Sequence, residues 1–183
     1  MKVQGHGKAK ILPVPELQRL FSDGGLISPR DRALFGILFY CGCRVSEALS
    51  LKTSDIDDGV ITLKKSITKG KIATRSVPIY PQLQRLLDEY KTKPGNLFPG
   101  RHGKGQMTRA GADKNLKEVC ERLVIKGVST HSFRRTNLTQ MSSSGVPLRV
   151  IQEVSGHQSL AALQRSLEVQ PEQVKAAIST VGF

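Results

Sequence analysis

Several features common in secreted and membrane proteins are missing from this sequence. It has no run of 18 apolar residues, and residues 1–8 lack the apolar segment of a secretory signal. Cysteine is scarce and its count is odd, and Cys41 and Cys43 are too close to pair comfortably in a helix, with Cys120 left over. These absences exclude a membrane-spanning helix, a signal peptide and a disulfide framework. Three reduced thiols suit the cytosol, so we expect a cytoplasmic protein with no membrane partner.

Acidic residues are also few. Asp and Glu total 15 against 28 Lys and Arg, which leaves a net charge of +13. The basic residues spread along the whole chain and do not form one tail, which favours a polyanionic partner, because neutralising phosphates releases condensed counterions. The alternative is a basic surface that only keeps the protein soluble. We favour nucleic acid as the partner, since the positive charge is distributed and not confined to one disordered tail.

Tyrosine is absent from the last third of the chain, since the only three are Tyr40, Tyr80 and Tyr90. A site built there therefore has no phenol hydroxyl available to it. The same third does contain two histidines and an arginine pair in helical, moderately apolar sequence: His131, Arg134-Arg135 and His157. An arginine and two imidazoles brought together would form a pocket for a phosphate.

The length of 183 residues fits one domain with a substantial core. Helical periodicity and caps predict helices over about 13–23, 28–41, 44–51, 82–90, 112–123, 131–141, 147–154, 161–167 and 171–178. β-branched runs predict two strands, over 59–63 and 74–79, with Thr68–Lys71 as a basic hairpin turn. Pro78 confines the second strand to an edge or a strand end. We predict the α+β class: a mostly helical domain with a small antiparallel sheet or hairpin.

Single motifs allow two interpretations each. His131 and Arg134 lie three apart, so on a helix both could face one phosphate, but taken alone the pair is more simply a helix start with polar caps. Arg44 follows the apolar stretch that ends in Cys43, and is either a surface cap or a phosphate clamp at a rigid helix junction. Lys69 on a hairpin tip is most simply a solvated turn residue.

The order of the motifs narrows these interpretations. The chain contains, in sequence, Cys43–Leu49, then Thr68–Lys71 with Arg75–Pro78, then Leu97–Pro99, His131–Arg134 and Gly156-His157. This series resembles the catalytic domain of the tyrosine recombinase (phage integrase) family over roughly residues 13–180. The resemblance implies the integrase-like DNA breaking-rejoining fold and an enzyme that breaks and rejoins DNA strands through a covalent 3′-phosphotyrosyl intermediate. It also implies double-stranded DNA as the partner and association with the nucleoid.

The resemblance also implies a role for each matching residue. Arg44 and Arg134 would clamp the scissile phosphate and offset charge in the transition state. Lys69 would protonate the leaving 5′ oxygen, with Lys71 as a less favoured substitute that also binds phosphate. His131 would assist proton transfer, His157 would donate a hydrogen bond to the phosphate, and Glu47 would support this group, orienting Arg44. No metal or cofactor is implied, because the two arginines and the lysine supply the positive charge.

One departure from the family pattern matters for activity. The nucleophilic tyrosine of the family falls nine residues after the second histidine, and here that position is Ser166. Two smaller departures are Ser132 and Ser155. An aliphatic hydroxyl ionises much less readily than a phenol, whose pKa is about 10. A serine oxygen also ends roughly 4 Å short of a tyrosine oxygen, while a misplacement of about 1 Å already costs ~10²-fold in rate. We therefore expect this chain not to cleave DNA efficiently.

Three hypotheses follow from this departure. The first is a recombinase catalytic domain whose nucleophile has been lost, either by design, to trap a DNA complex, or naturally. The second is a natural DNA-binding regulator or architectural protein on the recombinase scaffold. The third is a basic protein of unrelated function with an accidental motif match, and it predicts that the four candidate residues Arg44, His131, Arg134 and His157 lie scattered in the fold.

Two further expectations concern the ends of the chain. We expect residues 1–12 to be a flexible basic lead-in and residues 13–183 to form the catalytic domain, without the N-terminal core-binding domain that family members usually carry. The resemblance implies a DNA-bound tetramer in which the segment after the nucleophile packs on a neighbouring protomer. The predicted helix over Pro171–Ile178 would serve that exchange or fold back on its own chain, and both remain open.

Overall fold

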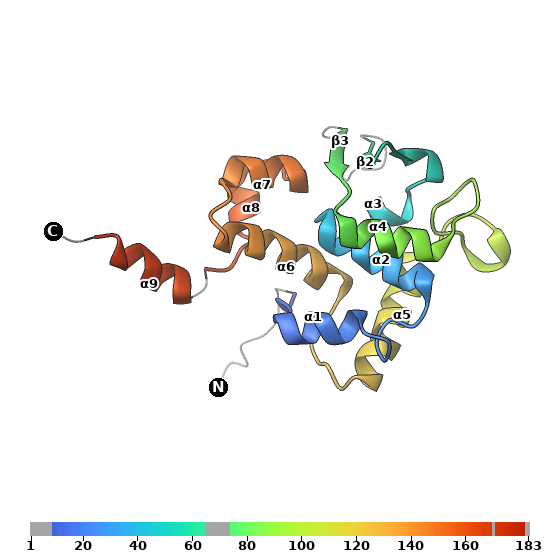
Figure 1. Ribbon diagram of the computed structural model, residues 1–183, viewed down its shortest axis with the longest axis horizontal. Coiled ribbons are helices and arrows are strands. Elements are labelled where there is room, and N and C mark those ends of the chain that lie inside the picture. The colour runs from blue at the N-terminus through green and yellow to red at the C-terminus, as the bar shows by residue number, and fades with distance from the viewer. Residues whose placement is uncertain (1–8, 65–73, 170, 182–183) are drawn as a thin grey trace.

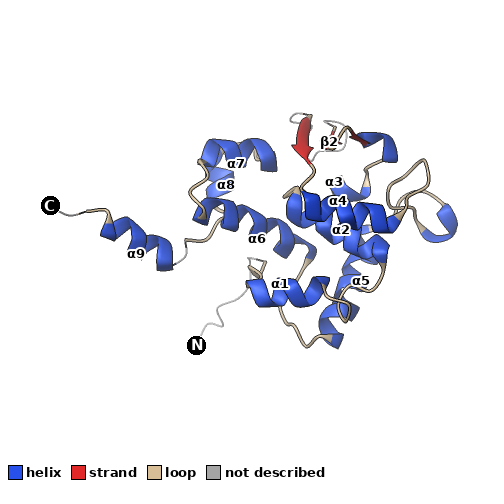
Figure 2. Ribbon diagram, in the orientation of Figure 1, coloured by secondary structure: helices blue, strands red, loops and turns tan. Residues whose placement is uncertain are grey.

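The computed structural model describes residues 9–64, 74–169 and 171–181, and these ranges form a mostly helical domain with one small sheet (Figures 1 and 2). The helices are α1 (Val14–Phe21), α2 (Pro29–Tyr40), α3 (Val45–Leu49), α4 (Pro81–Tyr90), α5 (Arg109–Arg122), α6 (Thr130–Ser143), α7 (Leu148–Ser155), α8 (Leu160–Gln164) and α9 (Pro171–Ser179), with two 3₁₀ turns, η1 (Thr53–Asp55) and η3 (Arg101–Gly103). The predicted α+β class is confirmed. None of the helices in the described ranges is long and apolar enough to cross a membrane.

The sheet has three antiparallel strands in the order β1 (Ile56–Asp57), β2 (Val60–Leu63) and β3 (Arg75–Pro78). Pro78 is the last residue of the edge strand β3, as predicted, because proline has no N–H to donate to a ladder. The two-residue strand β1 was not predicted, since so short a segment has no detectable alternation. The predicted turn over residues 68–71 lies outside the described residues.

The central element is α2, whose residues from Ala33 to Phe39 are all buried. Its sequence is apolar all round, which is typical of a helix enclosed on every side, and it packs against both α4 and α6. Pro29 occupies the first helical position after Ser28, although the Ser28 side chain makes no capping hydrogen bond. The helix stops before Gly42, whose φ of 54° lies in the left-handed region that favours glycine.

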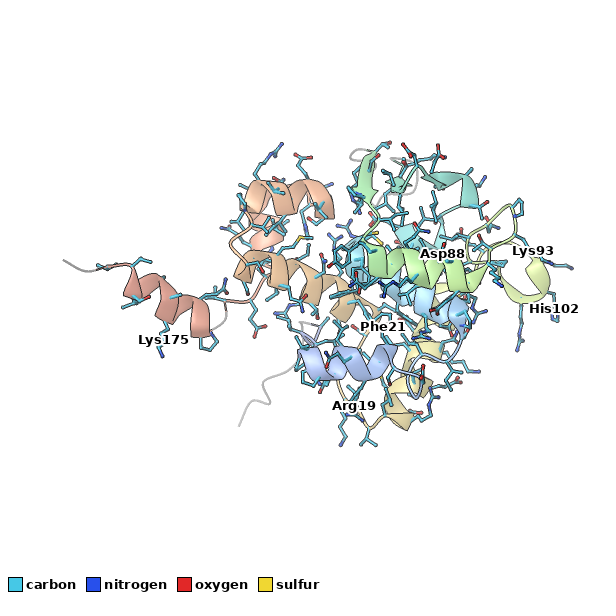
Figure 3. The ribbon with its side chains drawn as sticks, viewed as in Figure 1. Arg19, Phe21, Asp88, Lys93, His102 and Lys175 are labelled. Carbon is cyan, nitrogen blue, oxygen red and sulfur yellow. The ribbon has the colours of Figure 1, made fainter. Side chains whose placement is uncertain are left out.

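The helix α6 is joined to the core by an aromatic contact. The ring of Phe133 stacks on Phe35 of α2, with the centroids 5.1 Å apart, and meets the edge of Phe21 from α1 at 6.2 Å (Phe21 is labelled in Figure 3). Phe133 is completely buried. This contact fixes α6 against α2, and it therefore fixes the two neighbours His131 and Arg134 on the same helix.

A second, smaller apolar cluster assembles the last part of the domain. Leu138 of α6, Ile151 of α7 and Leu163 of α8 are all fully buried against one another. They hold α7 and α8 on α6, at the end away from η3 (Figure 1). The segment that follows α8, and carries Ser166, is thus positioned by this cluster.

The last helix, α9, lies away from the rest of the domain (Figure 1), and its Lys175 is labelled there in Figure 3. Near its start, the Gln173 side-chain amide donates to the Ser142 carbonyl at 3.3 Å. Val174 and Ile178 are 54% and 69% exposed. Among the described residues, this helix does not fold back over the apolar core.

Replacing Phe133 by alanine should lower the free energy of unfolding by about 3–5 kcal/mol, because it removes a fully buried ring from a stacked cluster. Urea denaturation followed by circular dichroism measures the change. Tyr80→Ala is the matched control: Tyr80 is 55% exposed and, within the described ranges, its ring stacks on Tyr40, so its loss should cost less than about 1 kcal/mol. Equal losses from the two variants would show that Phe133 does not anchor α6.

Candidate active site

A single buried carboxylate stands at the start of α3. Glu47 is fully buried, and its Oε2 accepts the backbone N–H of Arg44 at 2.8 Å while its Oε1 lies 3.3 Å from Arg44 Nη1. The same carboxylate pairs with Arg75 of β3, at 2.9 Å from Nη2 to Oε2 and 3.4 Å from Nη1 to Oε1. Burial raises the pKa of Glu47, but the hydrogen bond and charge of Arg75, with those of Arg44, outweigh it and lower the pKa overall. Glu47 is therefore a charged anchor for two arginines.

Arg134 projects from α6 into the same region and is only 6% exposed. Its Nη1 donates to the carbonyl of Gly42, and also to the carbonyl of Ser155 at 2.9 Å. Its Nη2 lies 3.3 Å from both ring nitrogens of His157. Burial, and then the charge of Arg44, lower the pKa of Arg134 to about 10, so the guanidinium stays protonated at neutral pH. The turn after α2 and the end of α7 thus fix this side chain.

His157 follows the left-handed Gly156 that ends α7. Its Nδ1 lies 2.7 Å from the Ser155 hydroxyl and its Nε2 lies 3.2 Å from the Ser166 hydroxyl. Burial, followed by the charge of Arg134, lowers the pKa of His157 to about 4. At neutral pH the ring is therefore uncharged and serves as a hydrogen-bonding group.

Ser166 lies just beyond the end of α8. Its N–H donates to Leu163 at 2.8 Å, and its hydroxyl donates to the carbonyl of Ala162 at 3.3 Å in addition to meeting His157. The Arg135 Nε donates to the Ser166 carbonyl at 3.3 Å. The backbone of this segment is thus held from two sides.

A pocket of about 190 Å³ lies beside these groups, lined by Ala9, His131, Arg134, Arg135, Leu138, Arg165 and Ser166. His131 is exposed at its rim, with Nε2 3.5 Å from Arg109 Nη2. Desolvation of the ring, and then the charges of Arg109 and Arg134, lower the pKa of His131. The pocket therefore has a cationic wall and a neutral imidazole at its edge.

Most of the predicted site residues lie together in the structure. Arg44 forms an ion pair with Glu47. Arg134 contacts His157, which in turn contacts Ser166, and His131 lines the same pocket as Arg134 and Ser166. The candidates Arg44, His131, Arg134 and His157 are therefore not scattered. Lys69 and Lys71 lie outside the described residues. The strands that lead to them, β2 and β3, pair with each other, and β3 also packs on α7.

Two residues of the site were not singled out from the sequence. Arg75 lies two residues before the buried Val77 on β3, so both side chains are on the inner face of the strand and the arginine needs a carboxylate partner. That two-residue spacing was the available signal. Ser155 was noted only as a minor departure, yet its side chain and its carbonyl contact His157 and Arg134. No sequence signal identifies it, because both contacts depend on the reversal of the chain at Gly156.

Comparisons with known proteins agree with one another. The model of the phage integrase family matches residues 12–172. The tyrosine recombinase XerC of Rhodospirillum centenum is 30% identical over 162 residues, which cover 84% of this chain and 47% of that protein. The XerD protein of Listeria monocytogenes is 31% identical over 174 residues, which cover 88% of this chain and 58% of that protein. The chain therefore spans about half the length of the curated relatives it matches.

Solved structures show the same fold. The XerA recombinase aligns with a TM-score of 0.81 at 22% identity, over 96% of this chain and 66% of that one. The catalytic domain of bacteriophage HP1 integrase aligns with a TM-score of 0.69 at 23% identity, over 94% of this chain and 95% of that domain. The family model and the fold both match over nearly the whole chain. The hypothesis that the motif match is accidental is therefore rejected.

The lowered pKa of His157 predicts a pH dependence of stability. Between pH 6.5 and about 4 the unfolded chain protonates this ring and the folded chain does not, so the free energy of unfolding should fall as the pH falls through this window. From pH 7 to pH 5 the loss should be about 1–2 kcal/mol, allowing for the partial exposure of the ring. In His157→Gln this part of the slope should vanish, as measured by urea denaturation at each pH. A variant with the same slope as the wild type would contradict the neutral state of His157.

Proposed function

The chain belongs to the phage integrase family, that of the tyrosine recombinases, and on this premise we propose that it is a site-specific recombinase domain that binds double-stranded DNA. A scissile phosphate would sit beside Arg44, Arg134 and His157. Strand cleavage would be deficient, because Ser166 stands where the family has its nucleophilic tyrosine.

The observation that carries this proposal is the charge of the cluster. Arg44 and Arg75 pair with one carboxylate, Glu47, a third guanidinium, that of Arg134, lies close enough to interact with Glu47 through its charge, and His157 is neutral. Concentrating positive charge in a partly buried site is costly unless an anion completes it. A phosphodiester supplies one negative charge and two non-bridging oxygens, which match the forked donors of arginine.

Each group then has a role in the reaction that the family performs. Arg44 and Arg134 hold the non-bridging oxygens and offset the charge that grows in the transition state. A hydroxyl oxygen attacks phosphorus, the bond from phosphorus to the 5′ oxygen breaks, and Lys69 gives its proton to that oxygen, with Lys71 as the substitute. His131 assists removal of the proton from the nucleophile, and His157 hydrogen-bonds the phosphate as a neutral imidazole.

The surroundings of Ser166 support the loss of cleavage. Its backbone is tied by the Leu163 and Arg135 hydrogen bonds, and Leu163 itself is completely buried in the second apolar cluster. The serine oxygen falls roughly 4 Å short of a tyrosine oxygen, and advancing it would require these contacts to break. The hydroxyl already points at His157, 3.2 Å away, which is a resting hydrogen bond and not an approach to DNA.

A second candidate function is a DNA-binding regulator or architectural protein that no longer cleaves. It is favoured by the way Ser155 and Ser166 occupy both nitrogens of His157, so that the imidazole is satisfied without a phenol. This candidate shares the phosphate site but predicts that restoring a tyrosine does not restore chemistry.

We further propose that the protein forms a homo-oligomer on DNA through α9. Val174 and Ile178 present an exposed apolar stripe on a helix that lies away from its own core (Figure 1). Packing of that stripe on a neighbouring protomer would bury it, as the resemblance to tetrameric recombinases implies.

The Ser166→Tyr variant should form a covalent protein–DNA adduct, since the pocket of about 190 Å³ beside this position has room for the ring. A pool of nicked duplexes of randomised sequence serves as suicide substrate, and the adduct is scored on a denaturing gel and its DNA sequenced. Ser166→Phe adds the ring without the hydroxyl and should give none. An adduct at comparable yield from the unmodified chain would refute the loss of cleavage, and none from Ser166→Tyr would favour the regulator.

Replacing Arg44 by glutamine should weaken DNA binding and reduce the slope of log K against log salt concentration by about 1, because one phosphate contact is lost. Fluorescence anisotropy of a labelled duplex over a salt series measures the slope. Arg85→Gln removes the same charge from the exposed face of α4 and serves as control. If both variants change the slope equally, the effect is one of net charge and Arg44 does not contact a phosphate.

A further inference from the structure

Arg75 connects three parts of the fold that carry the proposed phosphate ligands. Its side chain is only 10% exposed, and it binds residues 28 and 79 positions away in the sequence. The Nε donates to the carbonyl of Val154, near the end of α7, at 2.9 Å, while the two terminal nitrogens bind Glu47 at the start of α3. One side chain on β3 thus joins the sheet to the elements that bear Arg44 and His157.

The guanidinium lies directly against the backbone that precedes His157. A Cβ built on Gly156 would come within 2.7 Å of Arg75 Nη1 and 3.1 Å of its Cζ. Gly156 also has a φ of 64°, a conformation that favours glycine. The chain therefore reverses around Arg75, and this reversal sets the direction in which His157 leaves α7.

On the other side, Arg75 shares Glu47 with Arg44. Each carboxylate oxygen contacts both arginines: Oε2 receives Arg44 N–H and Arg75 Nη2, and Oε1 lies near one Nη1 of each. Without Arg75, the buried carboxylate would keep only Arg44 as its cationic partner. The Arg44 guanidinium would then be drawn fully onto Glu47 and away from a phosphate.

We propose that Arg75 is a positioning residue of the phosphate site, which sets Arg44 through Glu47 and His157 through the Val154–Gly156 turn. The inference rests on the proposed function, since it concerns the same site. The ordinary alternative is a structural ion pair that stabilises the fold without affecting the site. The two differ in a measurable way, because only the first links Arg75 to the affinity for phosphate.

The experiment tests whether the site needs the several donors of the Arg75 guanidinium. Arg75→Met keeps much of the length of the side chain and removes every polar contact that the side chain makes. Arg75→Lys keeps the charge but has a single ammonium, which cannot bind both Glu47 oxygens and the Val154 carbonyl at once. Arg32 offers a matched control, because it is also a partly buried arginine that binds one carbonyl, of Phe21 at 2.9 Å, and one carboxylate, of Glu89 at 3.6 Å.

The experiment titrates inorganic phosphate into the full chain with ¹⁵N-labelled histidine and follows the imidazole signals of His131 and His157 by NMR. Variants His131→Gln and His157→Gln assign the signals. We expect saturable shifts in the wild type, affinity weakened about tenfold in Arg75→Met, as misplaced ligands imply, and an intermediate affinity in Arg75→Lys. Arg32→Met should lose stability but bind phosphate as the wild type does.

Wild-type phosphate affinity in Arg75→Lys overturns the positioning role, and it does so even if Arg75→Met fails to fold. Equal losses of affinity in Arg75→Met and Arg32→Met also overturn it, since the cause would then be general destabilisation. If the wild type itself shows no saturable shift at His157, the phosphate site is absent and the proposed function fails first, with the positioning role following it.

Discussion

The arrangement of the site depends on one buried negative charge. Glu47 is the carboxylate that Arg44 and Arg75 share, and it is completely enclosed. A buried carboxylate is destabilising unless cations and hydrogen-bond donors pair with it. The Glu47 carboxylate therefore holds both arginine side chains in place. Because the two arginines come from α3 and β3, this requirement joins the helical part of the domain to its sheet. The proposed phosphate ligand Arg44 is thereby linked through Glu47 to the sheet.

The helix α6 contributes Arg134 to the site, and backbone carbonyls accept hydrogen bonds from its guanidinium. Arg134 donates to Gly42 and to Ser155, which end two different segments. Carbonyls carry no net charge, so they orient the guanidinium without neutralising it. Glu47 therefore offsets part of the positive charge of the cluster, while the carbonyls leave Arg134 cationic toward the pocket. The neutral His157 fits this arrangement, because a second cation beside Arg134 would be costly in a partly buried site.

The helices and the main strands were predictable because their signals are local. The uniform apolar stretch of α2 and the proline that begins it mark a buried central helix, and Pro78 marks a strand at an edge. Arg44, Arg134, His157 and Ser166 were predicted as site residues from the order of short motifs. The contacts that hold the site together were not predictable, because they join distant parts of the sequence: Arg75 binds Glu47, 28 positions away, and Val154, 79 positions away. The sequence did indicate that Arg75 faces inward, because it lies two residues before Val77 on the same strand. It did not indicate the contacts of Ser155, which arise from the turn that follows it.

The proposed replacement of a tyrosine by Ser166 concerns the chemistry of the site more than its architecture. The second apolar cluster, the Arg135 hydrogen bond and the end of α8 hold the backbone there through groups other than the side chain. The Ser166 side chain itself adds one contact to the site, with its hydroxyl 3.2 Å from His157 Nε2. The proposed phosphate site depends on Glu47 and on the carbonyls that bind Arg134, whereas the proposed cleavage step depends on the hydroxyl at position 166. For this reason we expect this protein to bind DNA but not to cleave it efficiently.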